Sequence, residues 1–177
     1  MRRLLIVAVV LAVVSVTAHI LTVWITPRLA MRVTWDRITE QYGVNNAGRP
    51  PLPTAASRSV AMPNPDLLHA VCAFDIPNGY LRVKARVPPG YWSLAVYAMN
   101  TDVLLSTNNR VAGEGLVEFL IAPENVTVPT SKNRTRLIRI QKTRGLVLVR
   151  TLVRDRANMG DQKAAQASVA CSPEQND

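Results

Sequence analysis

The sequence is poor in the residue types that most enzymes use for catalysis. It contains two histidines and two cysteines, and aromatic residues make up 5% of its 177 residues. The chain carries no nucleophile elbow, zinc-protease motif, P-loop or dinucleotide-binding motif. These absences argue against the common hydrolases and nucleotide-binding enzymes. We therefore expect a domain that is not catalytic.

Metal and nucleic-acid sites are no better supported. Cys72 and Cys171 lie too far apart for a zinc motif, and His69 is the only histidine outside the apolar N-terminal run. Nucleic acid fits poorly, because aromatic residues are scarce and no nucleic-acid-binding motif is present. We expect no metal, no cofactor and no nucleic-acid partner.

Basic residues are what the chain has in excess. The net charge is +9, and 17 of the 21 basic residues are arginine. Between Lys132 and Arg156, nine basic residues stand against one acid, Asp155. Such a run is typical of a solvated strand face or hairpin rim. It also suits attraction to anionic lipid headgroups, an acidic partner or a phosphate-bearing ligand.

Leu4 to Ile25 form a hydrophobic run in which no side chain is charged at neutral pH. As a helix these residues extend about 33 Å, enough to cross a hydrocarbon core of about 30 Å. Trp24 stands where interfacial aromatics are favoured, and Pro27 follows the run. The sequence therefore predicts a transmembrane signal anchor over residues 1–26.

A cleaved signal peptide is the alternative to this anchor. Arg2 and Arg3 precede the run, and Ala18 offers a small-residue cleavage site. The apolar run continues for seven residues beyond Ala18, longer than an ordinary signal peptide needs, which favours retention. Arginines flank both ends of the run, so the positive-inside rule does not decide its orientation. We expect the domain to face away from the cytoplasm.

A juxtamembrane helix is expected over residues 27–43. Met31, Trp35 and Ile38 recur at helical spacing and share one face, and Gly43 is a natural end. This helix either packs on the domain or lies in the headgroup layer, where its arginines would contact phosphates. Residues 44–58 are rich in proline and asparagine and are expected to form a linker.

Short apolar runs separated by turn residues fill the region from about 59 to 170. This pattern is typical of a mainly β domain, an antiparallel sandwich or open barrel. The expected strands are His69–Asp75, Leu81–Val87, Tyr91–Met99, Leu116–Ile121, Arg136–Gln141 and Leu146–Val153. Leu146–Val153 is almost continuously apolar, which indicates a central strand with both faces covered.

The C-terminal end of the chain is expected to be simpler. The Ala- and Gln-rich segment from Asn158 to Val169 predicts a short C-terminal helix, and residues 171–177 predict a polar tail. In an oxidising compartment, Cys72 and Cys171 can form a disulfide; otherwise they are two buried thiols.

The most unusual local sequence runs from Met62 to His69. Two prolines flank Asn64, and Asn64 and Asp66 are both suited to bond nearby backbone amides. The segment is either a turn that leads into the first core strand or one wall of a ligand pocket. The candidate ligand-binding residues for such a pocket are Asn64, Asp66, His69, Tyr91 and Arg150.

The same segment is the first of several short motifs that resemble a bacterial family, domain of unknown function 1254. Met62–His69 resembles the family's Pro-Asn-x-Asp-Thr-Leu-Tyr motif. The motifs that follow, in the family's order, are Phe74-Asp75-Ile76, Val87-Pro88, Tyr91-Trp92-Ser93-Leu94, Thr101-Asp102 and Leu146 to Thr151. The resemblance covers about Ser59 to Ala170.

The chain departs from the family's motifs at three polar positions. Leu67, His69 and Ala98 stand where the family has Thr, Tyr and commonly Asp, so a ligand site built from those positions would be altered here. The resemblance implies a β-rich domain that is often paired with a second uncharacterised domain. It implies no reaction, and we expect a separate protein to supply the companion domain.

Together these observations predict an envelope protein with a single-pass anchor in the bacterial inner membrane and a periplasmic domain. We expect a mainly β, non-catalytic domain that binds a partner protein or ligand at the membrane. Two alternatives stay open: an enzyme or enzyme remnant with a pocket around the Pro-Asn-Pro-Asp segment, and a module that binds anionic lipid.

Overall fold

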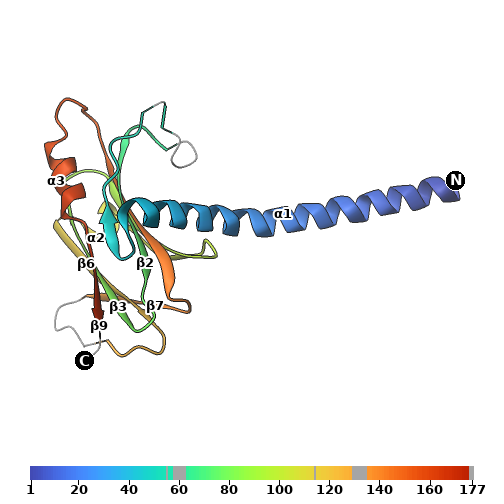
Figure 1. The fold of residues 1–177 in the computed structure, drawn as a ribbon. Helices are drawn as coiled ribbons and strands as arrows, with labels where there is room; N and C mark the ends of the chain where they lie inside the picture. The colour runs from blue at the N-terminus through green and yellow to red at the C-terminus, as the bar shows by residue number, and fades with distance from the viewer. Residues whose placement is uncertain (55, 58–62, 114, 129–134, 176–177) are drawn as a thin grey trace.

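The computed structural model describes residues 1–54, 56–57, 63–113, 115–128 and 135–175 (Figure 1). Its helices are α1 (Arg2–Tyr42), α2 (Asn109–Ala112) and α3 (Gly160–Ser168). Its strands are β1 (Asn46–Gly48), β2 (Leu67–Asp75), β3 (Gly79–Val87), β4 (Trp92–Ala98), β5 (Val103–Asn108), β6 (Gly115–Pro123), β7 (Arg136–Ile140), β8 (Arg144–Leu152) and β9 (Ala170–Gln175).

The strands form two sheets. The first sheet has the order β1-β2-β8-β4-β5, and the second has the order β7-β6-β3-β9. All strand pairs are antiparallel except β6 and β7, which run parallel. The prediction of a mainly β sandwich with an N-terminal apolar helix and a short C-terminal helix is confirmed. The almost continuously apolar strand, β8, is central in the first sheet, between β2 and β4.

The core lies between the sheets and follows from strand alternation. On β2, Cys72 and Phe74 point inward, and on β3 Leu81 and Val83 meet them from the second sheet; all four side chains are fully buried. Trp92 of β4 is also fully buried, and its indole N–H donates to the carbonyl of Gly113 at 3.0 Å. The outward residues of the first sheet are therefore left to be covered by another element.

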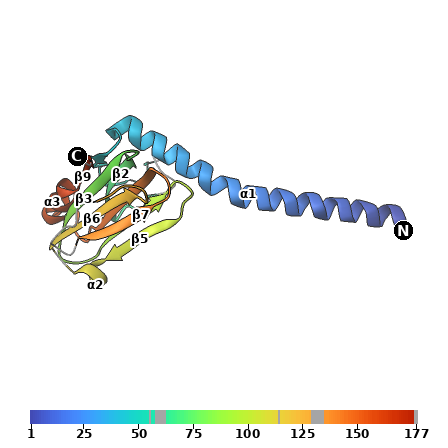
Figure 2. The ribbon, with the colours of Figure 1, turned by 90° about the horizontal axis from the view of Figure 1, so that it is seen from below.

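That element is the C-terminal part of α1. The helix continues unbroken past Pro27 and bends part-way along its length, as Figure 2 shows. Proline removes a backbone donor and crowds the preceding turn, so a bend is expected there. The N-terminal part projects away from the sandwich. By length and composition α1 is able to span a membrane, and none of its most apolar stretch is buried within the protein.

The structure adds strands in segments expected to lack them. The segment expected as a linker contains β1, and β9 occupies most of the segment expected as a polar tail. Strand β5 was not expected either. Some expected features lie outside the described residues: Ser59, Met62 and two members of the basic run, Lys132 and Arg134.

Candidate functional site

The sequence-predicted ligand residues gather at one end of the first sheet, around the end of β8. His69 and Arg150 are register partners on β2 and β8, and Arg150 Nε donates to Ser93 Oγ on β4 at 3.1 Å. Burial lowers the pKa of His69 below its usual value, and the positive charge of Arg150 lowers it further. This histidine is therefore kept neutral at neutral pH.

The other three predicted residues flank this end without joining the His69–Arg150 pair. Asn64 Oδ1 accepts from the Asp66 amide at 2.9 Å, an Asx turn. The Asp66 carboxylate lies 3.4 Å from Arg156, and both side chains are well exposed. Tyr91 is 45% exposed, and its carbonyl accepts from the Leu152 amide at 3.0 Å.

Together these contacts hold the first residues of β2 and β4 against the last residues of β8. Four cavities lined by described residues lie elsewhere on the protein. None of the four includes any of the five predicted residues. Two of the four cavities are instead lined by residues of α1, beside the first sheet.

Helix α1 docks on the outer face of the first sheet through its amphipathic face. Met31 and Ile38 are buried there against Ala73 of β2 and Leu146 of β8, and Trp35 packs beside them. The indole N–H of Trp35 is buried and has no acceptor among the described residues, so Trp35 contributes packing rather than a hydrogen bond. Of the two arrangements left open by the sequence, the structure shows the helix packed on the domain.

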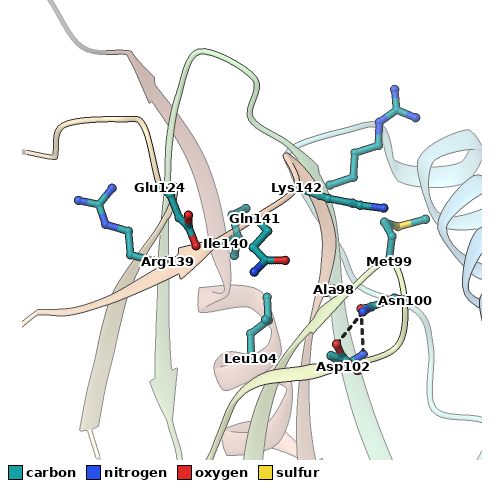
Figure 3. Close-up of a pocket in the computed structure, with 11 residues that line it drawn as sticks. Ala98, Met99, Asn100, Asp102, Leu104, Glu124, Arg139, Ile140, Gln141 and Lys142 are labelled. Carbon is teal, nitrogen blue, oxygen red and sulfur yellow. Dashed lines mark hydrogen bonds between the residues drawn. The ribbon is translucent and has the colours of Figure 1, made fainter.

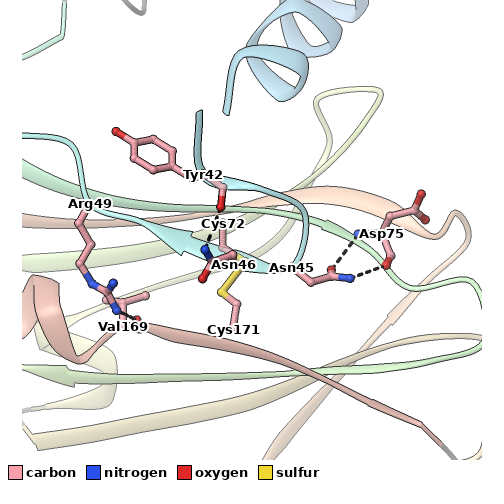
Figure 4. The surroundings of a disulfide bond; sticks show 8 residues. All are labelled: Tyr42, Asn45, Asn46, Arg49, Cys72, Asp75, Val169 and Cys171. Carbon is pink, nitrogen blue, oxygen red and sulfur yellow. Dashed lines mark hydrogen bonds between the residues drawn. A yellow bond between two sulfur atoms is a disulfide. The ribbon is translucent and has the colours of Figure 1, made fainter. Parts of the chain in front are cut away.

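Two asparagines attach the end of α1 to the sheet (Figure 4). Asn45 exchanges two hydrogen bonds with the backbone of Asp75 at the end of β2, at 2.9 and 3.0 Å. Asn46 Nδ2 donates to the carbonyl of Tyr42, the last residue of the helix, at 2.8 Å. A side chain at Gly48 would collide with the Tyr42 ring, so glycine is required for this close approach.

The largest of the four cavities is a cleft of about 620 Å³ beside α1. We call it the juxtamembrane cleft. Its walls are the helix on one side and the β4–β5 and β7–β8 turns on the other, and both turns lie on the side of the sandwich from which α1 leaves (Figure 1). It is lined by Arg32, Trp35, Asp36, Met99, Gln141, Lys142, Thr143 and Arg144.

Arg144 has the best-defined surroundings in this cleft. Its Nε donates to Asp75 Oδ2 at 2.7 Å, and its guanidinium carbon lies 5.2 Å from the centre of the Trp35 ring. A guanidinium has five N–H donors. Within the described part of the chain, the bond to Asp75 is the one hydrogen bond that the Arg144 guanidinium makes. Most of its N–H donors are therefore unused by the protein.

A second cavity of about 280 Å³ adjoins the juxtamembrane cleft on the other side of the β7–β8 turn (Figure 3). Met99, Gln141, Lys142 and Arg144 line both cavities. In Figure 3 Lys142 and Met99 lie on the side that faces α1. Arg139 lines the far side, where its Nη1 donates to the carbonyls of Pro123 and Val126 at 2.8 and 2.5 Å.

Cys72 of β2 and Cys171 of β9 form a disulfide that joins the two sheets (Figure 4). Their Cα atoms are 6.7 Å apart, and both side chains are buried. Arg49 lies nearby and donates to the carbonyls of Gln166, Ala167 and Val169 at 3.3, 3.0 and 2.9 Å. These bonds cap the C-terminal end of α3 with a positive charge.

A network of charged residues covers the outer face of the second sheet. Arg82 of β3 bonds Glu118 of β6 at 2.5 Å and also pairs with Glu174 of β9. Tyr80 donates its hydroxyl proton to Glu174 at 2.5 Å. The hydrogen bonds from Arg82 are the largest cause that lowers the pKa of Glu174, to about 2. The network ties three strands together.

The cavities described above offer positively charged and apolar side chains. No group of three or more His, Cys, Asp or Glu residues among the described residues is arranged to hold a metal ion. Sequence reasoning missed the contributions of Asn45, Asp75 and Arg144 because they are far apart along the chain. The helical spacing of Trp35 and Ile38 was the signal that pointed to this face.

Comparison with known families decides where the chain belongs. Residues 44–173 match a family model described as "Protein of unknown function (DUF1254)". The chain belongs to this family. The match begins at Val44, two residues after α1 ends, so it covers the sandwich and leaves the helix outside. No curated protein shows significant sequence similarity to the chain.

Two solved structures are similar to this DUF1254 protein. The VPA0106 protein from Vibrio parahaemolyticus is 14% identical with a TM-score of 0.65; the match covers 85% of this chain and 39% of that one. A putative uncharacterized protein from Burkholderia cenocepacia is 15% identical with a TM-score of 0.46, and the shares are 85% and 40%. The similarity to the Vibrio protein supports the fold described above. The chain spans about two fifths of the length of these relatives.

Proposed function

We propose that this DUF1254 protein is a non-catalytic protein of the bacterial cell envelope. In this proposal, α1 crosses the inner membrane once, and the sandwich stands on the periplasmic side and binds a partner protein. The observation that carries the proposal is the continuity of α1. One unbroken helix includes the apolar stretch, of which none is buried, and the amphipathic face that packs on the first sheet.

The disulfide supports the periplasmic side. Disulfides form and persist in oxidising compartments and are rare in the cytosol. Cys72 and Cys171 are the two cysteines of the sequence, and the structure pairs them across the sandwich. A domain held by this bond is suited to the periplasm.

The length of the relatives supports a partner. The match covers 39% of the Vibrio protein, so most of that protein has no counterpart in this chain. We propose that the sandwich binds a separate protein that carries a companion domain. Side chains that are strongly exposed and apolar on the sandwich, such as Val103 at 57% and Leu116 at 62%, are candidates for its contact surface.

Photo-crosslinking in intact cells tests the proposal. The full chain would carry a photoreactive amino acid at Val103 or at Leu116, and at exposed Lys163 on α3 as the matched control position. We expect one discrete adduct from Val103 or Leu116, the same partner by mass spectrometry in repeat experiments, and no such adduct from Lys163. The absence of any discrete adduct, together with an unchanged envelope after loss of the protein, would refute partner binding.

A further inference from the structure

We propose that the juxtamembrane cleft binds the headgroup of an anionic phospholipid of the bilayer that α1 enters. The proposal rests on the proposed function only in that α1 lies in the membrane. It does not depend on a protein partner. Three lines of observation lead to it: the charges in the cleft, the position of the cleft along the helix, and the apolar residues beside the charges.

Arg32, Lys142 and Arg144 bring three positive charges to the cleft, against one negative charge from Asp36. Asp75 lies outside the lining and neutralises part of the Arg144 charge. The side chains of Arg32 and Lys142 make no hydrogen bond or ion pair within the part of the chain that the structure describes. The cleft therefore has positive charge in excess and unused donors, which is what a phosphodiester requires.

The juxtamembrane cleft begins just beyond the headgroup layer, within reach of a long side chain. With Leu4–Ile25 in the hydrocarbon core, Arg32 lies about 10 Å beyond the core along the helix. The headgroup layer itself is about 5–8 Å thick on each side. Side chains on a helix lean toward its N-terminus, here toward the membrane, so the Arg32 guanidinium reaches back to this layer.

Arg28 lies one turn earlier on α1, and its guanidinium is folded over Trp24. Its Nη1 donates to the carbonyl of Trp24 at 2.6 Å, and its guanidinium carbon lies 4.1 Å from the centre of the Trp24 ring. An arginine folded over a tryptophan is the pairing found at membrane–water interfaces. In the proposed orientation, Trp24 and Arg28 would lie at the bilayer surface, on the membrane side of the juxtamembrane cleft.

The cleft also offers apolar surface beside its cations. The Trp35 ring and the Met99 side chain line it together with the charged residues. A lipid headgroup carries an anionic phosphate attached to a less polar glycerol, so a cleft with both kinds of lining suits it better than a free phosphate ion.

A titration of the full chain in a neutral detergent tests the proposal. The three probes are dihexanoyl phosphatidylglycerol, dihexanoyl phosphatidylcholine and inorganic phosphate, and thermophoresis gives each Kd. We expect saturable binding of phosphatidylglycerol that is at least tenfold tighter than binding of the other two. Equal affinity for both lipids, or inorganic phosphate as tight as phosphatidylglycerol, would overturn the lipid assignment.

Matched charge variants locate the site. The double variant Arg32→Glu with Lys142→Glu should weaken phosphatidylglycerol binding by about tenfold or more. The control, Arg110→Glu with Lys163→Glu, makes the same charge change on α2 and α3 and should leave it unchanged. If the control weakens binding equally, general attraction rather than the cleft explains it, and the proposal fails. Arg32→Gln with Lys142→Gln repeats the test if the charge reversals fail to fold.

Asp36→Asn provides a test in the opposite direction. Removing the one acid that lines the cleft should strengthen phosphatidylglycerol binding by about twofold to fivefold, because it removes a like charge from beside the phosphate. Unchanged or weaker binding in this variant would count against a phosphate beside Arg32 and Lys142. All of these outcomes leave the partner proposal untouched, because crosslinking reports on Val103 and Leu116.

Discussion

Glu174 shows how strongly a single side chain can depend on residues that are distant in the sequence. It accepts from Tyr80 and Arg82, which precede it by more than 90 residues, and these contacts form only when β9 pairs with β3. Because its folded-state pKa, about 2, lies below the ordinary value of 4.5, the folded protein favours the ionised carboxylate. The corresponding stability is present above pH 4.5 and is lost as the pH falls toward 2.

Glu174→Gln should therefore lower the free energy of unfolding at pH 7 and have little effect near pH 2. We expect a loss of about 1 to 3 kcal/mol at pH 7, toward the lower end because solvent screens this surface network. Urea unfolding of the full chain in neutral detergent at both pH values measures it. Glu124→Gln, at an exposed acid, should change the value by less than about 0.5 kcal/mol. A loss of the same size in the free energy of unfolding at pH 2 would contradict the lowered pKa of Glu174.

Sequence patterns anticipate only some of the side-chain contacts at this scale. His69 and Arg150 are register partners because β2 and β8 pair as neighbours, and their role in ligand binding stays a prediction. Arg144 and Asp75 were not linked by any sequence pattern. Their contact depends on the register of β2 against β8, which only the folded sheet defines.

The strands show which elements a sequence pattern predicts well. All six expected strands are present, and five of them have a neighbour on each side. The three strands that were not expected, β1, β5 and β9, are all at sheet edges. An edge strand is anchored on one side only and needs fewer apolar residues, so its periodicity is weak. The expected strand 136–141 is also an edge strand, β7.

Helix α1 was predictable as two segments but not as one. The helical spacing of Met31, Trp35 and Ile38 predicted the face of α1 that docks. Pro27, however, indicated a boundary between two separate helices. The structure continues the helix through Pro27 because a proline costs one hydrogen bond, and the apolar residues before it and the docked face after it both favour helix. Residue 26 is therefore not the end of a helix, and it stays a prediction of where the membrane-spanning part of α1 ends.

Ile38→Ala should detach the C-terminal part of α1 from the sheet. Ile38 is 8% exposed, and truncating such a side chain costs about 2 kcal/mol or more. Hydrogen exchange of the amides from Met31 to Tyr42 measures docking. We expect the variant to exchange faster than the wild type at these amides, with a smaller change in β8. Val33→Ala is the matched control, because Val33 is 41% exposed on the same helix. Equal effects from both variants would show that docking does not depend on this face.

At the scale of the whole molecule, the disulfide is a covalent link between the two sheets. Its cysteines are separated by 99 residues, so the bond restricts most of the unfolded domain. Replacing both cysteines with serine should lower the free energy of unfolding by about 2–4 kcal/mol, measured with urea.

The same bond tests the compartment in cells. Protein extracted under alkylating conditions should shift in gel mobility on reduction, and the shift should be absent in the double serine variant. Two alkylatable thiols in unreduced protein would contradict both the bond and the periplasmic assignment.

The unbroken path of α1 has a mechanical consequence. A spanning helix answers a change in bilayer thickness by changing its tilt. Because α1 is packed on the first sheet and fixed at its end by Asn45 and Asn46, the sandwich must turn with it. If α1 spans a bilayer as proposed above, its tilt would therefore set how far the distal loops stand from the membrane and which way they point.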